Sequence, residues 1–212
     1  MVNEELKAVK LAQIANEVRV CTKCELCRTR MQAVPGEGPA SARVLLIGEG
    51  PGWHEDQQGK PFVGASGKFL SELLESAGLR REDVFITNVV KCRPPSNRDP
   101  MPDEIAACSE YLDRQIAALD PEIVVTLGRF SMARWFPGER ISRIHGQVKR
   151  EGRRVIVPMY HPAAALHQGA LRATIKEDFE KLPKILAEVE RFREAERERE
   201  QDEPPVAQMS LF

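Results

Sequence analysis

Short apolar runs alternate along this chain with segments of helical periodicity, and no other feature constrains its fold as strongly. The runs fit buried parallel strands, because strands covered on both faces read as nearly continuous apolar sequence. They span residues 43–47, 84–88, 123–127 and 154–159. Helical spacing of apolar side chains covers residues 4–20, 66–77, 102–119, 128–136 and 174 to about 199. This alternation predicts an α/β fold, a three-layer α/β/α sandwich around a central, mostly parallel, four-stranded sheet.

The length of 212 residues favours one domain followed by a tail. We expect the domain to span residues 1–193 and a flexible, charged tail to span 194–212, where Glu and Arg dominate before two prolines. No apolar run approaches the roughly 20 residues of a membrane span, and the N-terminal residues lack a signal-peptide pattern. These features predict a cytoplasmic protein without a membrane partner.

Five cysteines in such a chain indicate metal or redox chemistry rather than a disulfide framework. Cys21, Cys24 and Cys27 form a C-x2-C-x2-C motif, whereas Cys92 and Cys108 lie far downstream. Four thiolates suit either a tetrahedral zinc ion or a 4Fe–4S cluster, and the spacing alone does not separate the two.

Glycine-rich and polar residues follow three of the predicted strands. The loop Gly48-Glu49-Gly50-Pro51-Gly52 follows the first strand, Asn88 ends the second and His161 follows the last. Because parallel sheets bind ligands at the carboxyl ends of their strands, we expect these residues to share one cleft. Gly50 and its neighbours would let a ligand approach closely, the Asn88 amide can read a nucleobase edge, and Glu49 can pair with His161 in catalysis.

Phe62 lies in a loop that glycine and proline brace, Gly59-Lys-Pro-Phe-Val-Gly64. A rigid phenylalanine beside a cleft can stack on a flat ring, although a minor core position is the commoner role. The loop 48–52 also allows an alternative, a nucleotide-binding hydrolase or transferase with zinc in the cysteines. Against it, the loop has no following Lys-Ser or Lys-Thr, and Pro51 removes an amide that a phosphate cradle would use.

Taken together, these motifs resemble the family 4 uracil-DNA glycosylases, iron–sulfur DNA repair enzymes of bacteria and archaea. The resemblance spans residues 21–182, most of the chain. It is carried by Cys21-x2-Cys24, Gly48-Glu-Gly-Pro-Gly-x-x-Glu55-Asp56, Gly59-Lys-Pro-Phe-Val-Gly64, Thr87-Asn-Val-Val-Lys-Cys-Arg-Pro-Pro95, Cys108, Ile144-His-Gly146 and His161-Pro162. Each motif is weak alone, and their order and joint presence are specific.

The resemblance implies a DNA repair hydrolase that cleaves the N-glycosidic bond of uracil in single- or double-stranded DNA, releasing uracil and leaving an abasic site. It implies Glu49 and His161 as catalytic residues. It implies a uracil pocket formed by Gly50, Phe62, Asn88 and His145, and a 4Fe–4S cluster on Cys21, Cys24, Cys92 and Cys108. Cys27 falls outside this ligand set as a spare thiol, and Leu166 is the candidate wedge that fills the vacated base stack. We further expect a monomer, associated with the nucleoid.

A similar sister class traps the abasic sugar covalently through a histidine that follows an Arg-Arg-Ile run. Residues 140–146 here read Arg-Ile-Ser-Arg-Ile-His-Gly, so His145 is present but the basic insertion of that class is not. This difference favours hydrolysis of the glycosidic bond over covalent trapping of the sugar. The alternatives are a covalently trapping protein and a non-enzymatic protein that binds uracil-containing DNA.

The segment Gln208-Met-Ser-Leu-Phe212 is similar to the short peptide by which bacterial repair and replication proteins dock on the sliding clamp. Gln208 would form a hydrogen bond at the rim of the clamp's cleft, and Leu211 and Phe212 would fill its apolar interior. The sequence therefore predicts the sliding clamp as a second partner.

Overall fold

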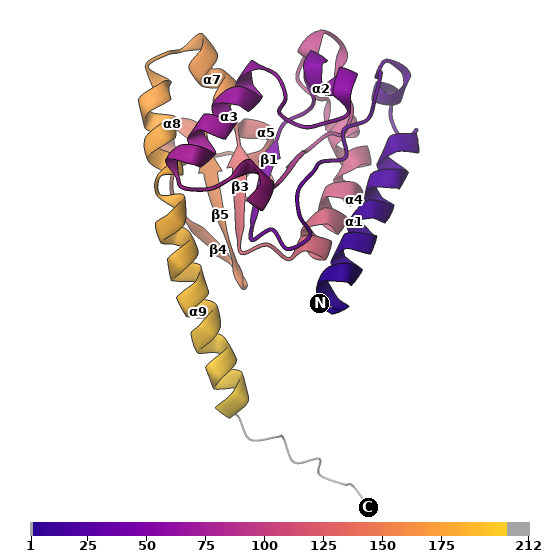
Figure 1. The fold of residues 1–212 in the computed structure, drawn as a ribbon. Coiled ribbons are helices and arrows are strands. Elements are labelled where there is room, and N and C mark those ends of the chain that lie inside the picture. Colours follow the sequence, from indigo (N-terminus) through magenta and orange to yellow (C-terminus); the bar gives the residue numbers. More distant parts are fainter. Residues whose placement is uncertain (1, 203–212) are drawn as a thin grey trace, which may run out of the picture.

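The computed structural model describes residues 2–202 and contains one sheet with helices packed on both faces (Figure 1). The sheet has the strand order β2-β1-β3-β5-β4. Its strands are β1 (Val44–Gly48), β2 (Phe85–Asn88), β3 (Ile123–Leu127), β4 (Lys149–Glu151) and β5 (Arg154–Met159). All neighbours pair in parallel except β4 and β5, and Leu46 in β1 lies opposite Ile86 and Val125. The α/β sandwich with a mostly parallel sheet is thus confirmed.

The predicted number of four strands is wrong, because β4 adds a fifth strand at one edge. This strand is the tripeptide Lys-Arg-Glu, it is exposed throughout, and it pairs antiparallel with β5. The connecting Gly152 has a φ of 58°, a left-handed conformation that suits glycine in a tight turn. A short, wholly exposed strand buries nothing, so its sequence carries no apolar pattern. At the other edge, Glu37 forms an antiparallel bridge to Ile86 of β2.

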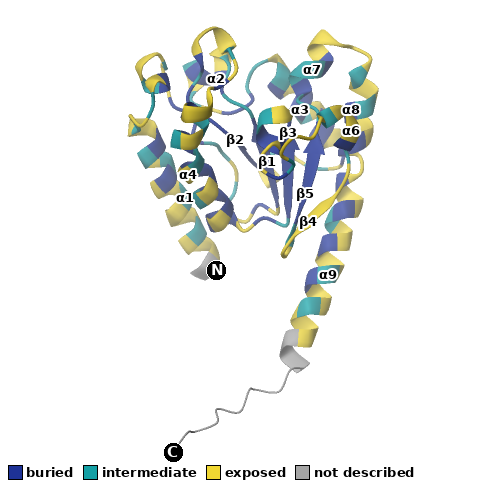
Figure 2. Ribbon diagram, turned by 180° about the vertical axis from the view of Figure 1, so that it is seen from behind, coloured by how far each residue is buried: buried dark blue, intermediate teal, exposed yellow. Residues whose placement is uncertain are grey.

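The core lies in two layers because the four parallel strands are buried on both faces, as Figure 2 shows. In β1, Val44 and Leu46 face one layer while Leu45 and Ile47 face the other, as the two-residue period of a strand requires. Helices α1 (Val2–Val20) and α4 (Pro102–Leu119) pack side by side in the second layer. The first layer contains apolar side chains of α3 (Ala65–Ser76), α7 (Pro162–His167), α8 (Leu171–Phe179) and α9 (Leu182–Asp202).

The helices differ from the sequence prediction mainly where they are short or interrupted. The long helix expected from residue 174 is two helices, α8 and α9, because Pro183 lacks an N–H and fits only the first turn of a new helix. The helix expected over 128–136 is a single turn, α5 (Arg129–Met132). The expected loop 49–64 contains α2 (Trp53–Gln58), and α6 (Ile141–Ile144) precedes β4. One-turn helices bury too few side chains to set up a periodic pattern.

Helix α9 continues to Asp202 and so covers the first residues of the expected tail. The clamp-binding residues Gln208, Leu211 and Phe212 lie outside the described residues. In the part of the chain that the structure describes, every helix is too short or too polar to cross a membrane.

Candidate active site

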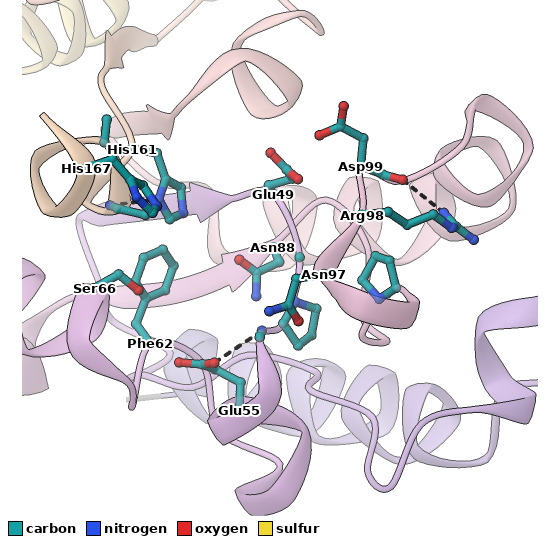
Figure 3. Close-up of a pocket in the computed structure, with 16 residues that line it drawn as sticks. Glu49, Glu55, Phe62, Ser66, Asn88, Asn97, Arg98, Asp99, His161 and His167 are labelled. Atoms are coloured by element: carbon teal, nitrogen blue, oxygen red, sulfur yellow. Dashed lines mark hydrogen bonds between the residues drawn. The ribbon is translucent and has the colours of Figure 1, made fainter.

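The carboxyl ends of β1, β2 and β5 surround one cavity of about 590 Å³. Glu49 and Gly50 follow β1, Asn88 is the last residue of β2, and His161 follows β5 (Figure 3). Phe62 reaches the same cavity from the segment between α2 and α3. The structure therefore brings five of the predicted site residues together.

Glycines make this close assembly possible. A Cβ atom on Gly48 would lie 2.4 Å from Asn88 Oδ1 and 2.8 Å from Phe62 Cε2, so no side chain fits there. A Cβ atom on Gly67 would lie 1.9 Å from the carbonyl oxygen of Phe62. The backbone of Phe62 itself has a φ of 51°, which non-glycine residues adopt at an energetic cost. The surrounding packing thus holds Phe62 in one defined position.

Glu55, a residue without an assigned role in the sequence prediction, fixes the two loops that carry Glu49 and Phe62. Its buried carboxylate accepts hydrogen bonds from the N–H groups of Val63 at 2.8 Å, Gly64 at 2.9 Å and Gly52 at 3.1 Å. The available sequence signal was its place at the third position of a helix, where a carboxylate reaches back to the capping residue.

Asn88 presents an unsatisfied acceptor to the cavity. Its side chain is only 1% exposed, and its Oδ1 has no hydrogen-bond partner among the described residues. Buried polar atoms are nearly always hydrogen-bonded, so an orphaned amide oxygen in a cavity wall marks a place where a ligand or a water molecule can supply the donor. The main-chain carbonyl of Asn88 accepts a hydrogen bond from Lys91 Nζ at 2.8 Å.

The imidazole of His161 is neutral and can donate a hydrogen bond through one ring nitrogen. Its Nδ1 accepts a hydrogen bond from the N–H of Ala163 at 3.1 Å, which places the proton of the neutral ring on Nε2. Burial lowers the pKa of His161 to about 4, and the nearby Glu55 opposes this shift only in part. The ring is therefore uncharged at neutral pH.

The Glu49 carboxylate points into the cavity (Figure 3). Burial raises its pKa above the ordinary range, Asp99 adds to the effect, and Arg129 opposes it. Arg129 forms an ion pair with Asp99, so its positive charge is already shared. The cavity thus places a carboxylate and a neutral imidazole on one sheet edge, a pair suited to a reaction that develops opposite charges.

Two predicted residues lie away from the cavity wall. His145 does not line the cavity; its Nδ1 lies 2.6 Å from Oδ2 of the buried Asp178, and its ring packs against Tyr160 at 4.9 Å between centroids. It therefore touches the chain next to His161 rather than the space for a ligand. Leu166 lies on α7 with its side chain 48% exposed, between cavity-lining residues Ala164 and His167.

The cysteines meet in a second, smaller cavity that Cys27 lines together with the four predicted ligands. Its wall is formed by Cys21, Cys24, Cys27, Cys92 and Cys108 with Arg30, Lys91 and Tyr111 among their neighbours. Within the described residues, no three potential metal ligands already stand in a coordinating arrangement. All five thiols are free.

The surroundings of the thiols nonetheless fit an anionic metal centre. Burial raises the pKa of Cys92 to about 11 and also raises the pKa of Cys24 and Cys108, so thiolates there need positive partners. Arg30 Nη1 lies 3.0 Å from Cys92 Sγ, and the main-chain N–H of Lys91 donates to Cys108 Sγ at 3.3 Å. Hydrogen bonds of this kind to ligand sulfurs are typical of iron–sulfur sites.

The sequence of the chain is similar to those of known proteins. Residues 35–187 match the model of the uracil DNA glycosylase superfamily. The chain is 50% identical to the type-4 uracil-DNA glycosylase of Saccharolobus solfataricus over 82% of this chain and 85% of that protein. It is 48% identical to the Sulfurisphaera tokodaii enzyme of the same name (86% and 87% covered) and 46% identical to that of Archaeoglobus fulgidus (82% and 92%).

Proposed function

This chain belongs to the type-4 uracil-DNA glycosylases of the uracil-DNA glycosylase superfamily, and we propose that it hydrolyses the N-glycosidic bond of uracil in DNA. The products are free uracil and an abasic site, the first step of base excision repair. The orphaned Oδ1 of Asn88, held between Glu49 and Phe62 in one cavity, is the observation that carries this proposal.

Asn88 selects uracil by matching its hydrogen-bonding edge. The orphaned Oδ1 accepts from N3–H of the base, and the amide NH2 donates to O4. Cytosine presents an amino group and an unprotonated N3 at the same places, so both contacts would face like groups. Each unpaired group in a buried pocket costs about 1–3 kcal/mol, which is enough to exclude cytosine.

The base reaches this cavity only after it leaves the DNA stack, which costs a few kcal/mol. Stacking on the ring of Phe62 offsets part of that cost, because base–aromatic stacking is worth about 1–3 kcal/mol. Leu166 is exposed beside the cavity, and an apolar side chain in that place can fill the gap that the base leaves in the stack.

His161 and Glu49 stabilise the two charges that separate as the bond breaks. Negative charge develops on the uracil carbonyl oxygen, where the Nε2–H of neutral His161 donates without any change of protonation. Positive charge develops on the sugar, and the Glu49 carboxylate stabilises it while orienting the attacking water. Both groups are half-buried, and the reduced contact with water strengthens these interactions.

For the cysteine cavity we propose a 4Fe–4S cluster held by Cys21, Cys24, Cys92 and Cys108, with Cys27 as a spare thiol. Such a cluster would act as a structural cross-link. Cys21 and Cys24 lie between α1 and the turn Glu25–Arg28, Cys92 follows β2, and Cys108 is on α4. These four thiols would therefore tie the N-terminal segment to the chain that follows Asn88.

Residues 208–212 are proposed to dock on the sliding clamp through Gln208, Leu211 and Phe212. Support comes from the sequence of this segment alone. Burial of two or three side chains gives an affinity on the order of micromolar, and tethering would raise the local concentration of enzyme on replicating DNA.

The decisive experiment incubates the protein with single- and double-stranded DNA that contains one uracil and then treats the DNA with alkali. Strand breaks at the uracil, absent from matched DNA with thymine or cytosine, are the expected result. Binding without breaks would favour a non-enzymatic uracil-DNA-binding protein. A protein–DNA adduct that resists denaturation would favour covalent trapping.

A further inference from the structure

Lys91 is a fully buried lysine whose Nζ has no carboxylate partner among the described residues. Its side chain is 1% exposed. Its Nζ donates to three neutral oxygens, Thr87 Oγ1 at 2.6 Å, Gln115 Oε1 at 2.7 Å and the Asn88 carbonyl at 2.8 Å. A buried charge is costly unless an opposite charge lies near it, so three neutral acceptors leave the ammonium incompletely compensated.

A metal centre held by the cysteines would supply negative charge close to Lys91, in the cysteine cavity. Lys91 lines that cavity, its N–H donates to Cys108 Sγ at 3.3 Å, and the next residue is Cys92. A centre built from four thiolates carries net negative charge, and the net charge around such a centre helps to set its reduction potential. Arg30, which reaches Cys92 Sγ, lies among the same lining residues.

The Lys91 ammonium lies against the end of β2, the strand that carries Asn88. Its Nζ bonds to the main-chain carbonyl of Asn88, and Thr87, the residue before Asn88, supplies a second acceptor. The third acceptor, Gln115, is itself anchored through its Nε2 to the Pro35 carbonyl at 2.6 Å. These bonds fix the end of β2, and with it the direction in which the Asn88 amide points.

We propose that Lys91 is a positioning residue that connects the two cavities: its main-chain N–H contacts Cys108 Sγ at the cysteine cavity, and its ammonium holds the Asn88 main chain in the base-reading position. The inference rests on the proposed function and goes beyond it, because it makes base recognition depend on Lys91, a residue outside the uracil pocket. A change in the charge of the metal centre would then alter the position of Asn88 through the side chain of Lys91.

The test replaces Lys91 with methionine, which keeps most of the volume and removes the charge, and compares Gln115→Met, which removes one acceptor and keeps the charge. Each protein is purified with its iron, and three quantities are measured: the midpoint potential of the iron–sulfur centre, the inhibition constant of free uracil, and the Kd for DNA with an abasic site. Uracil excision by the wild type is measured first, so failure of the proposed function is seen before any variant is compared.

For Lys91→Met we expect a more negative midpoint potential and an inhibition constant for free uracil raised about tenfold, with abasic-DNA affinity unchanged. For Gln115→Met we expect a smaller rise in the inhibition constant and the wild-type potential. A wild-type potential in Lys91→Met would refute the electrostatic role. Wild-type inhibition by uracil in that variant would refute the positioning of Asn88.

If Lys91→Met does not fold, Gln115→Glu keeps the test decisive by placing a carboxylate on the ammonium. The added charge compensates Lys91 locally, so the midpoint potential should move in the negative direction relative to Gln115→Met. Equal potentials in the two Gln115 variants would overturn the proposal.

Discussion

The rings of Phe62 and His161 lie stacked, with 5.5 Å between their centroids and 27° between their planes. A base stacked between the two rings would need their centroids to lie twice the normal stacking distance apart. The observed 5.5 Å is shorter than that. We therefore expect uracil to stack on Phe62 beside His161, with its edge toward the imidazole N–H. In this proposed arrangement, Phe62 would contact the face of the base and His161 would contact its edge.

Replacing Phe62 should weaken capture of the extruded base without changing which base is read. We expect Phe62→Ala to lower kcat/KM for uracil about 10–100-fold, the equivalent of a lost stacking interaction, and Phe62→Leu to lose less. Single-turnover excision and a uracil-versus-cytosine comparison measure both effects. Cytosine excision that appears in Phe62→Ala would contradict the division of roles.

Asn88→Asp should change base preference, because an ionised carboxylate accepts hydrogen bonds and donates none. The O4 atom of uracil would then face a like group, whereas the amino group of cytosine would gain an acceptor. Excision of uracil should fall and the preference for uracil over cytosine should shrink, as measured on paired oligonucleotides. An unchanged preference would show that Asn88 does not read the base; Asn88→Ala is the control for loss of the amide alone.

Glu49→Ala and His161→Ala should each slow excision by about 10²–10⁴-fold and leave DNA binding nearly intact. The double variant should lose less than the product of the single losses, because both groups act in one bond-breaking event. Rapid-quench single-turnover rates give the comparison. Any variant that retains the wild-type rate removes its residue from the mechanism.

The acid side of the pH–rate profile should report Glu49. Excision needs the carboxylate, and burial raises the pKa of Glu49, so activity should be lost as the pH falls through a value above that of an ordinary glutamate. His161, with a pKa of about 4, stays neutral over most of that range. In Glu49→Gln, the residual kcat/KM should not fall in this way as the pH is lowered from 7 to 4. A fall that persists in this variant would assign the titration to another group.

Deleting residues 208–212 should abolish binding to the sliding clamp and leave excision from a short oligonucleotide unchanged. The deletion removes the proposed apolar anchors and keeps every described residue that lines either cavity. Calorimetry with the cognate clamp measures the first effect. Clamp affinity that survives the deletion would rule out this segment as the docking peptide.

Sequence patterns sufficed for features that depend on burial or on local motifs. The four parallel strands are buried on both faces, so their apolar runs are visible, and the residues that follow three of them converge because parallel strands end at one edge. The role of Glu55 depends on three amide groups that only the folded loops bring together. Burial of Lys91 was not predictable, since lysine is usually exposed and nothing in Val89-Val90-Lys91-Cys92 indicates its acceptors.

The two edges of the sheet bear on how the protein behaves at high concentration. Unpaired strand edges are templates for aggregation, and proteins counter this with short, charged edge strands or with covering segments. Here β4 ends the sheet with Lys149, Arg150 and Glu151, all exposed, and the chain around Glu37 bridges to β2 at the opposite side. Sheet extension by a second molecule would have to pair with a charged tripeptide or displace a bridged segment. Both sides of the sheet are therefore protected against edge-to-edge aggregation without any contribution from the catalytic cavity.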